Sequence, residues 1–425
     1  MFPLVQVVAY IGIFALFVFI LLFGESSYFR EGPVGAAHAV LTQRVPFWIH
    51  KFFILLCGKT LVRRCDAAAT WCAESRNPLF QIFFLVLLTS GVWVFLITAW
   101  GRIFNAGGIH ILLAPLSISS VYASFLRACW SDPGTLTAAN VAKAQEIWPY
   151  DEILFREKEC RTCHFVKPAR SKHCALCGIC VAKSDHHCAW INNCVGHNNF
   201  RFFLAFLATT VTMCFYGAYL AYHVFVLEMR VQQVDMLVVY DHVAGTRVPL
   251  TREQKWMYMI HRELLLTALG MFCICAGVVV VAFMLYQLSL IAARGITTNE
   301  SFKWDDVAYD VKEGVVHLPR RVLECNRRGL SPTTRKAPSP PPASAAGGGG
   351  GKAGGGGGVA RKRKQQQQRV VERKARDKQK QEEMEERNGD GDELVTIRSV
   401  TELRNIYHLG WWRNLLDVLF PVPLD

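Results

Sequence analysis

Long parts of the chain lack charged side chains. Only 19% of the 425 residues are Asp, Glu, Lys or Arg, whereas 52% are hydrophobic. No charge occurs within residues 1–24, 79–101, 103–126, 202–227 and 264–293. An uncharged apolar run of about 20 residues crosses the roughly 30 Å hydrocarbon core of a bilayer. This pattern excludes a large soluble protein and predicts an integral membrane protein.

We predict five membrane-spanning helices. The first, at residues 5–23, also has the length of a cleaved signal peptide, but no basic region precedes it and no clean small-residue cleavage site follows. A retained anchor is therefore favoured, and the remaining four uncharged runs supply the other spans. A shorter apolar run at 45–57 is interrupted by Lys51, so we predict it to be interfacial or re-entrant.

Basic residues are distributed unevenly among the segments that connect the predicted spans. They concentrate between the first two spans, in residues 131–200 and after the last span, whereas the connection between the second and third spans offers only Arg102. Lys and Arg accumulate on the cytosolic side of membrane proteins. We therefore expect the N-terminus and the 229–263 loop to face the lumen, and the basic regions to face the cytosol.

The most basic segment lacks aromatic residues. Residues 335–387 contain 14 Lys and Arg against 6 Asp and Glu, but a nucleic-acid-binding face would interleave aromatics with its cations. A solvated tail near anionic lipid is the favoured interpretation, with a Pro-rich and Gly-rich flexible linker at 331–358. The chain also has no KDEL-type ending and no lipidation box. Residues 400–422 return to an amphipathic, aromatic pattern, which predicts a segment that docks on the membrane or on the enzyme body.

Cysteines cluster in one short segment. Seven of the fifteen lie between Cys160 and Cys194, which indicates either a disulfide framework or a metal site. Because the predicted topology puts the segment in the reducing cytosol, metal ligation is favoured. Two C-x2-C pairs with further Cys and His nearby are typical of tetrahedral zinc sites.

The segment contains more candidate ligands than two zinc ions need. Eight ligands complete two tetrahedral sites, and ten candidates are present: Cys160, Cys163, His173, Cys174, Cys177, Cys180, His186, His187, Cys188 and Cys194. The surplus falls in the run Asp185-His186-His187-Cys188, where a thiol beside an imidazole and a carboxylate can form a nucleophile. The alternative is that all ten residues only bind metal or fill structure. Spacing alone does not say which histidine would be the base.

The segment resembles the cysteine-rich domain of the DHHC-type protein S-acyltransferases, or palmitoyltransferases. The resemblance covers roughly residues 80–305, and the five-span layout resembles a subgroup with an extra N-terminal span. Its motifs are Asp132-Pro133-Gly134, Cys160-x2-Cys163, Lys167-Pro168-x-Arg170-x2-His173-Cys174, Cys177, Cys180, Asp185-His186-His187-Cys188, Trp190, Asn193-Cys194-x-Gly196, Asn199 and Thr297-Thr298-x-Glu300.

The resemblance implies a role for each matching residue. One zinc ion would bind Cys160, Cys163, His173 and Cys180. The other would bind Cys174, Cys177, His187 and Cys194. Cys188, His186 and Asp185 would then be the catalytic set. Separately, we expect the cations Lys167, Arg170 and Lys172 to contact the phosphates of acyl-CoA.

We therefore expect an all-α polytopic membrane protein with a cytosolic zinc-binding cysteine-rich domain of short β-hairpins and loops. The expected units are residues 1–130 (three spans), 131–200 (cysteine-rich domain), 201–295 (two spans), 296–330 (cytosolic segment), 331–399 (disordered tail) and 400–425 (amphipathic segment).

The expected activity is transfer of a long-chain acyl group, palmitoyl, from acyl-CoA through a Cys188 thioester to cysteines of membrane-associated proteins. The bilayer is a further partner and nucleic acid is not. The subgroup resemblance favours the endoplasmic reticulum or Golgi. Two other functions compete with this one. A membrane-anchored zinc-finger scaffold would not need Cys188, and a transporter would need ionisable residues within its spans, where only His110 and His223 qualify.

Overall fold

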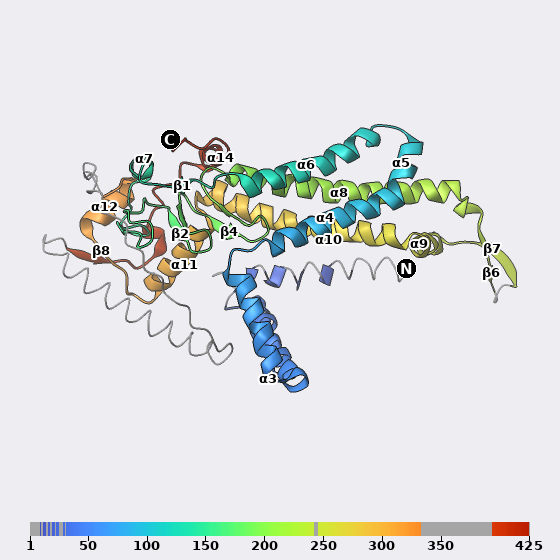
Figure 1. Ribbon diagram of the computed structural model, residues 1–425, viewed down its shortest axis with the longest axis horizontal. Coiled ribbons are helices and arrows are strands. Elements are labelled where there is room, and N and C mark those ends of the chain that lie inside the picture. Colours follow the sequence, from blue (N-terminus) through green and yellow to red (C-terminus); the bar gives the residue numbers. More distant parts are fainter. Residues whose placement is uncertain are drawn as a thin grey trace.

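A computed structural model describes residues 31–241, 245–332 and 393–424, with scattered residues among the first 30. Four long helical segments form an elongated bundle, and a cysteine-rich module covers one end of it (Figure 1). The bundle consists of α4 (Leu79–Phe95) continued by η2 (Leu96–Trp100) and α5 (Gly101–Ala106), α6 (His110–Trp130), α8 (Phe200–Val231), and α10 (Leu264–Leu288) continued by η4 (Ser289–Arg294).

Five helical segments in the described part of the chain are long and apolar enough to cross a membrane. Four are the bundle helices, which overlap the predicted spans at 79–101, 103–126, 202–227 and 264–293. The fifth is Pro33–Trp71, whereas the predicted first span at 5–23 lies largely outside the described residues. The mostly helical, multi-pass character expected from the sequence is confirmed.

The boundary between the second and third spans was predicted wrongly. The sequence pattern placed it at Arg102, but the helix continues to Ala106 and the turn lies at residues 107–109. Arg102 stays inside the helical segment because two carboxylates neutralise it: its Nε lies 3.0 Å from Glu228 and its Nη2 lies 2.8 Å from Glu263. The ion cluster ties α5, α8 and the start of α10 together at the end far from the cysteine-rich module.

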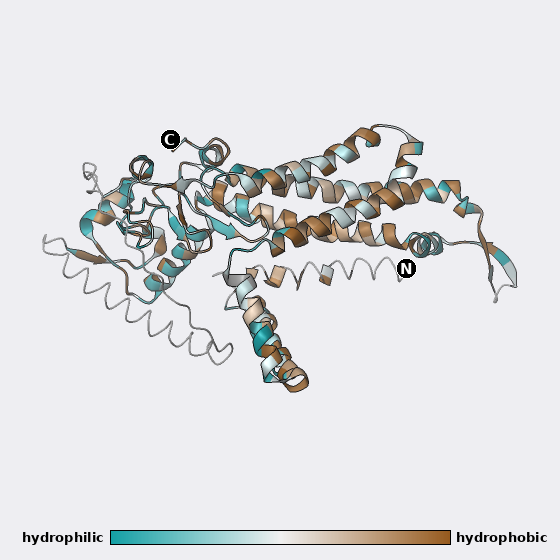
Figure 2. Ribbon diagram, viewed as in Figure 1, coloured by the Kyte–Doolittle hydropathy of each residue, from teal (hydrophilic) through white to brown (hydrophobic). Residues whose placement is uncertain are grey.

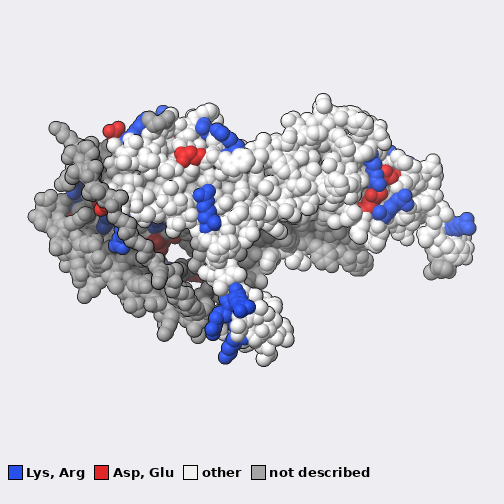
Figure 3. Space-filling model, in the orientation of Figure 1, with Lys and Arg blue, Asp and Glu red and all other residues white. Residues whose placement is uncertain are grey.

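The surface of the bundle matches a membrane slab. Hydrophobic residues dominate its length (Figure 2). In the view of Figure 3, the Lys, Arg, Asp and Glu residues gather towards the two ends of the bundle and on the projecting α3 (Val45–Glu74). Two short elements, α2 (Pro33–Ala39) and η1 (Val40–Arg44), lead into α3. The predicted interfacial run at 45–57 forms the first part of α3.

The cysteine-rich module is built from very short strands. The first sheet has the antiparallel order β1-β3-β2, and a separate antiparallel hairpin pairs β4 with β5. The predicted domain of short β-hairpins and loops is confirmed. The strands are β1 (Thr135–Leu136), β2 (Lys172–Cys174), β3 (Ile179–Val181), β4 (His186–Cys188) and β5 (Asn193–Val195), and α7 (Val141–Ile147) packs beside them.

The remaining elements lie at the two ends of the bundle. At the far end are η3 (Val234–Met236), the β6–β7 hairpin (Val238–Asp241 and Thr246–Pro249) and α9 (Arg252–Arg262). At the module end are α11 (Thr298–Lys312), β8 (His317–Pro319), α12 (Arg320–Arg328), β9 (Leu394–Thr396), η6 (Val400–Glu402) and α14 (Trp411–Leu419). The predicted disordered tail lies mostly outside the described residues.

Candidate active site and metal centres

The first Cys/His cluster forms where a knuckle meets the β2–β3 hairpin. His173 and Cys180 face each other directly across that hairpin, and Cys160 and Cys163 approach from a tight turn in which the Cys163 amide donates to the Cys160 sulfur at 3.4 Å. The Nδ1 atom of His173 lies 3.5, 3.4 and 3.6 Å from the sulfurs of Cys160, Cys163 and Cys180. Four donor atoms therefore surround one point.

The second cluster repeats this design on the β4–β5 hairpin. His187 and Cys194 face each other across it, Cys174 ends β2, and Cys177 lies in the turn that follows. The Nδ1 atom of His187 lies 3.7, 3.3 and 3.6 Å from the sulfurs of Cys174, Cys177 and Cys194. The two clusters interleave in sequence because β2 supplies one residue to each.

Both clusters fit a zinc ion by donor type and spacing. Each offers three thiolates and one imidazole, and the four donor atoms of each lie within 4.8 Å of one another. Zn–S bonds of about 2.3 Å in a tetrahedron place neighbouring ligands roughly 3.5–3.8 Å apart, which matches the observed separations. The membership of both clusters is the one that the resemblance implied. These residues have the capacity to hold two metal ions.

Strand geometry separates the two adjacent histidines. Successive side chains of a strand point to opposite faces, so His187 of β4 faces the metal cluster while His186 and Cys188 face the other way. Neither cluster includes His186 or Cys188. The β4–β5 hairpin therefore places His187 in the metal cluster and His186 on the same face of the strand as Cys188. Spacing alone left this distinction open.

Asp185 orients His186. Its side chain is only 2% exposed, and one carboxylate oxygen lies 2.6 Å from Nδ1 of His186. Burial lowers the pKa of His186, but the hydrogen bonds with Asp185 and Cys188 outweigh it and raise the pKa to about 10. Such a histidine holds its proton near neutral pH, which suits an imidazolium that stabilises a neighbouring thiolate.

Backbone carbonyls at the end of α6 fix the position of the β4–β5 hairpin relative to the helical bundle. Asn193 lies opposite Cys188. Its side-chain Nδ2 donates to the carbonyls of Ala128, Cys129 and Ser131 at 3.3, 3.2 and 2.9 Å. These carbonyls end the α6 helix and would otherwise lack partners. The residue opposite Cys188 is thus fastened to the end of a membrane-spanning helix.

The sequence after the hairpin allows a close crossing of two chain segments. A Cβ atom on Gly196 would lie 2.5 Å from the carbonyl oxygen of Pro133 and 2.4 Å from a methyl of Val181, so only glycine fits. Asn199 then closes the turn, accepting from the Gly196 amide at 2.9 Å and donating to the Cys194 carbonyl at 2.8 Å. This turn delivers the chain directly into α8.

Cys188 lies at the mouth of a large apolar cavity. The cavity has a volume of about 750 Å³ and runs between α4, α6, α8 and α10, with His186, Cys188 and Trp190 at one end. Phe95, Ala114 and Leu220 line its far end. The lining residues of α8 extend from Phe203 to Leu220, a rise of about 25 Å along the helix. A cavity that extends this far along the bundle and is lined by apolar residues suits an extended hydrocarbon chain.

Small residues open part of this space. Gly217 and Ala276 line the cavity, whereas Ala218 and Gly277 are absent from the lining. Gly277 instead lets α10 approach α8, because a Cβ there would lie 3.2 Å from the ring of Phe215. In each of these neighbouring pairs, Gly217–Ala218 and Ala276–Gly277, one residue lines the cavity and the other does not.

Comparison with known proteins agrees with this geometry. The sequence model of the DHHC palmitoyltransferase family matches residues 153–305. Palmitoyltransferase swf1 of Emericella nidulans is 30% identical over 95% of this chain and 94% of its own length. The chain belongs to the DHHC palmitoyltransferase family. Palmitoyltransferase swf1 of Schizosaccharomyces pombe (34% identical, 73% of this chain and 83% of its own) and that of Neurospora crassa (29%, 95% and 89%) are also similar. Family membership supports protein S-acyltransferase activity.

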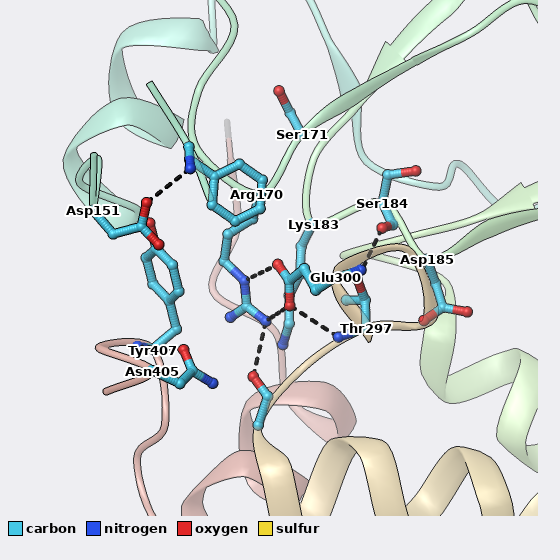
Figure 4. A network of polar contacts seen from close by, with 12 residues as sticks. Asp151, Arg170, Ser171, Lys183, Ser184, Asp185, Thr297, Glu300, Asn405 and Tyr407 are labelled. Carbon is cyan, nitrogen blue, oxygen red and sulfur yellow. Dashed lines mark hydrogen bonds and ion pairs between the residues drawn. The ribbon is translucent and has the colours of Figure 1, made fainter. Parts of the chain in front are cut away.

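A buried ion pair joins two motifs of this family member that are far apart in sequence (Figure 4). The guanidinium of Arg170 contacts both carboxylate oxygens of Glu300 at 2.6 and 2.7 Å and donates to the Gly295 carbonyl at 3.0 Å. Glu300 also accepts from the Thr297 amide at 2.9 Å as part of a capping box that begins α11. Both charged side chains are at most 4% exposed, so the pair is desolvated.

The capping box reaches the catalytic candidates. The Thr297 hydroxyl donates to the Ser184 carbonyl at 3.2 Å, and the Thr298 amide donates to the second carboxylate oxygen of Asp185 at 2.6 Å. Asp185 is therefore held between Thr298 and His186, with both oxygens committed. Figure 4 shows Thr297, Ser184 and Asp185 near the Arg170–Glu300 pair.

The position of Arg170 is inconsistent with its predicted contact to acyl-CoA phosphates. Its guanidinium is enclosed by Glu300, the Gly295 carbonyl and the ring of Tyr407, whose centroid lies 5.0 Å away. Lys172 is exposed and Lys167 half-buried, so both remain candidates. Lys303 of α11, which the sequence reasoning did not single out, is a further cation near Lys167 and Lys172. Burial lowers the pKa of Lys303, and Lys167 and Lys172 lower it further against the opposing effect of Glu300 and Asp151, to about 8.

The C-terminal segment completes the module. We predicted that residues 400–422 dock on the membrane or on the enzyme body, and contacts with the body are present. The Tyr407 hydroxyl donates to the Pro149 carbonyl at 2.7 Å, the Asn414 amide donates to the Ala292 carbonyl at 3.1 Å, and Asp417 pairs with Lys183. Trp411, Trp412 and Phe420 remain exposed on the outer face. In sequence this segment follows the low-complexity tail, so its pattern predicted docking but not which residues it contacts.

Proposed function

We propose that this protein transfers a long-chain acyl group, palmitoyl, from acyl-CoA to cysteines of membrane-associated proteins, with Cys188 as the nucleophile. The observation that carries the proposal is the position of Cys188, a thiol outside both metal clusters, beside His186 and Asp185, at the mouth of an apolar cavity of about 750 Å³. In this proposal the cysteine-rich module faces the cytosol and the home membrane is that of the endoplasmic reticulum or Golgi.

The reaction would proceed by two thioester exchanges. The Cys188 thiolate attacks the carbonyl carbon of the acyl-CoA thioester, the new S–C bond forms, and CoA leaves as a thiolate that takes up a proton. A substrate cysteine, as its thiolate, then attacks the acyl group on Cys188 and releases the Cys188 thiolate. Each step replaces one thioester with another, so no nucleotide hydrolysis is required, and catalysis depends on proximity and on thiolate formation.

Residues of this chain would supply each requirement. His186 would hold the proton drawn from Cys188, and Asp185 would orient the ring and stabilise its positive charge. The cavity would remove the acyl chain from water, at about 0.8 kcal/mol for each buried methylene. Lys167, Lys172 and Lys303 would face the phosphates of the donor. Two zinc ions, bound by the two clusters, would brace the hairpins that carry the site.

Neighbouring histidines provide a sharp test of this assignment. We expect His186→Gln to lower the rate of self-acylation by about 10²–10⁴-fold with two zinc ions retained, since only the base is lost. His187→Gln should instead reduce the zinc content from two ions to one and destabilise the module. Both variants would be purified and incubated with labelled palmitoyl-CoA, with zinc measured on the same samples.

A non-enzymatic scaffold would give a different result. It requires the metal clusters but has no use for His186, so His186→Gln would then be silent and wild-type protein would take up no hydroxylamine-sensitive label. A transporter, which would need ionisable residues within its spans, is less well supported. The charged Arg102 lies within a bundle helix, but Glu228 and Glu263 neutralise it at the far end of the bundle. The acyl-transfer proposal fails if His186→Gln acylates itself at the wild-type rate.

The cavity makes a prediction about chain length. Gly217 lies fourteen residues after Phe203 on α8, about 21 Å deeper along the helix. We expect Gly217→Leu to lower the ratio of palmitoyl to myristoyl transfer by about tenfold, because two methylenes excluded from the cavity are worth about 1.6 kcal/mol. The measurement is a competition between acyl-CoA donors of different length.

Ala218→Leu is the matched control for this experiment. Ala218 is the next residue on α8 but does not line the cavity, so its replacement should leave the donor ratio unchanged. An equal shift in both variants would mean that the effect comes from helix packing, and the cavity would not set the chain length.

A further inference from the structure

The α3 element is a helical hairpin rather than one straight helix. Gly58 has φ 76° and ψ 156°, outside the helical region, and on either side of it His50 and Asp66 meet at 3.0 Å. The chain therefore turns back at Gly58 and the two arms lie against each other. At 1.5 Å per residue, the second arm, 59–74, is about 24 Å long, too short to cross about 30 Å of hydrocarbon alone. The first arm is longer, because α2 and η1 continue its helix back to Pro33.

The hairpin exposes an unusually large apolar surface. Among its described side chains only Val62 is buried. Leu55 is 83% exposed and Trp48 is 65% exposed, and both lie on the first arm. A continuous apolar surface of this kind marks a contact with protein or lipid. The exposed apolar residues of the hairpin are Val45, Phe47, Trp48, Ile49, Phe52, Phe53, Leu55, Leu56, Leu61 and Trp71.

The place of the hairpin in the fold indicates lipid. It leaves the junction between the bundle and the cysteine-rich module at a steep angle to the bundle helices (Figure 1). Because those helices cross the membrane, an element at a steep angle to them at that level runs along the membrane surface. Its root is also fastened beside the site: Arg76 donates to the Asn192 carbonyl at 3.4 Å, and Phe80 packs against Trp190 with ring centroids 5.7 Å apart.

The charges of the hairpin indicate the kind of lipid. Lys51 lies over the rings of Phe47 and Trp48, at 4.7 and 5.3 Å from their centroids, as a cation does when its stem lies among apolar groups and its head in the headgroup layer. The second arm carries Lys59, Arg63 and Arg64, all exposed, and Figure 3 shows cations gathered on α3. Tryptophan at the interface and basic residues beside it are typical of helices that lie on anionic membranes.

We propose that the α3 hairpin is an in-plane membrane anchor for anionic lipid on the module side of the bilayer. The aromatic first arm enters the boundary between headgroups and acyl chains. Arg63 and Arg64 of the second arm bind anionic headgroups. The anchor holds the β4–β5 hairpin, and with it Cys188, at a fixed depth. The proposal rests on the multi-pass character of the protein and not on its acyl-transfer activity.

The native thiols Cys57 and Cys65, both exposed in the hairpin, allow a test in the full chain. The protein would be placed in nanodiscs of phosphatidylcholine with or without phosphatidylserine. Modification by a bulky, membrane-impermeant maleimide would be followed at each cysteine by peptide mass spectrometry, relative to the denatured chain. We expect Cys57 to react at least tenfold more slowly than in the denatured chain in both lipids, and Cys65 to become protected when phosphatidylserine is present.

Charge variants separate the parts of the proposal. Arg63→Gln with Arg64→Gln should reduce the lipid-dependent protection of Cys65 by about 30-fold, since each basic residue contributes about fivefold to membrane partitioning. Arg247→Gln, at the other end of the bundle on β7, is the matched control and should change nothing. The Cys188→Ser variant should show wild-type protection, which keeps this result independent of the acyl-transfer proposal.

Two outcomes would overturn the anchor. Reaction of Cys57 at the denatured rate in nanodiscs would place the first arm in water. If Cys65 were equally protected with and without phosphatidylserine, and in the arginine variants, anionic headgroups would be excluded as the ligand. Such a result would indicate that protein contacts shield Cys65.

Discussion

Cys188→Ser is expected to abolish self-acylation from labelled palmitoyl-CoA, with a loss on the order of 10³-fold or more in rate. A serine hydroxyl does not ionise near neutral pH, so His186 and Asp185 would face a group that cannot form the attacking anion. Zinc content should stay at two ions per chain, because Cys188 belongs to neither cluster. The label would be tested for release by hydroxylamine, which cleaves thioesters.

Cys129→Ala is the matched control for that substitution. Cys129 is buried in the same apolar cluster as Cys188 and lies outside both metal clusters. Its replacement should leave the self-acylation rate near that of the wild type. If Cys188→Ser retained hydroxylamine-sensitive label while Cys129→Ala lost it, the nucleophile would be misassigned. If both variants lost zinc, the comparison would report unfolding of the module and not chemistry.

Much of the cysteine-rich module was predictable because its determinants are local. The ligands of both clusters fall within 35 residues, and their pairing follows from two hairpins whose strands are only three residues long. Spacing and resemblance together were sufficient for the cluster membership. The four bundle helices were predictable for the same reason, since each span is a continuous apolar run.

The errors arose where a residue is stabilised by a distant partner. Arg170 was predicted to face acyl-CoA because it is a cation in a basic region, but its carboxylate partner Glu300 lies 130 positions later in the chain. Arg102 was predicted to end a helix for a similar reason, and Glu228 and Glu263 keep it inside one. Local composition gives the charge of a side chain but not the group that neutralises it.

The distinction between His186 and His187 needed the fold for another reason. The two residues have the same chemistry and adjacent positions, so local sequence is symmetric between them. The register of β4 against β5 breaks the symmetry, because His187 is opposite Cys194 and His186 is opposite Val195. The resemblance implied the same assignment, and strand alternation supplies its physical reason.

The buried Arg170–Glu300 pair should carry the second largest effect. Arg170→Met removes the cation and leaves a carboxylate that is 1% exposed, with the Thr297 amide as a remaining partner. Removing one member of a buried ion pair costs about 3–5 kcal/mol. We expect a corresponding fall in the thermal midpoint of the purified protein, together with slower self-acylation, because the Thr297–Thr298 cap that holds Asp185 depends on Glu300.

Two comparisons make this prediction specific. The double variant Arg170→Met with Glu300→Gln should recover part of the lost stability, since no uncompensated charge then remains buried. Arg320→Met breaks an ion pair with Glu393 in which both side chains are more than half exposed, and it should cost no more than about 1 kcal/mol. If Arg170→Met and Arg320→Met were equally mild, the Arg170–Glu300 pair would not hold the cap, and the orientation of Asp185 would depend on His186 and the β4–β5 hairpin alone.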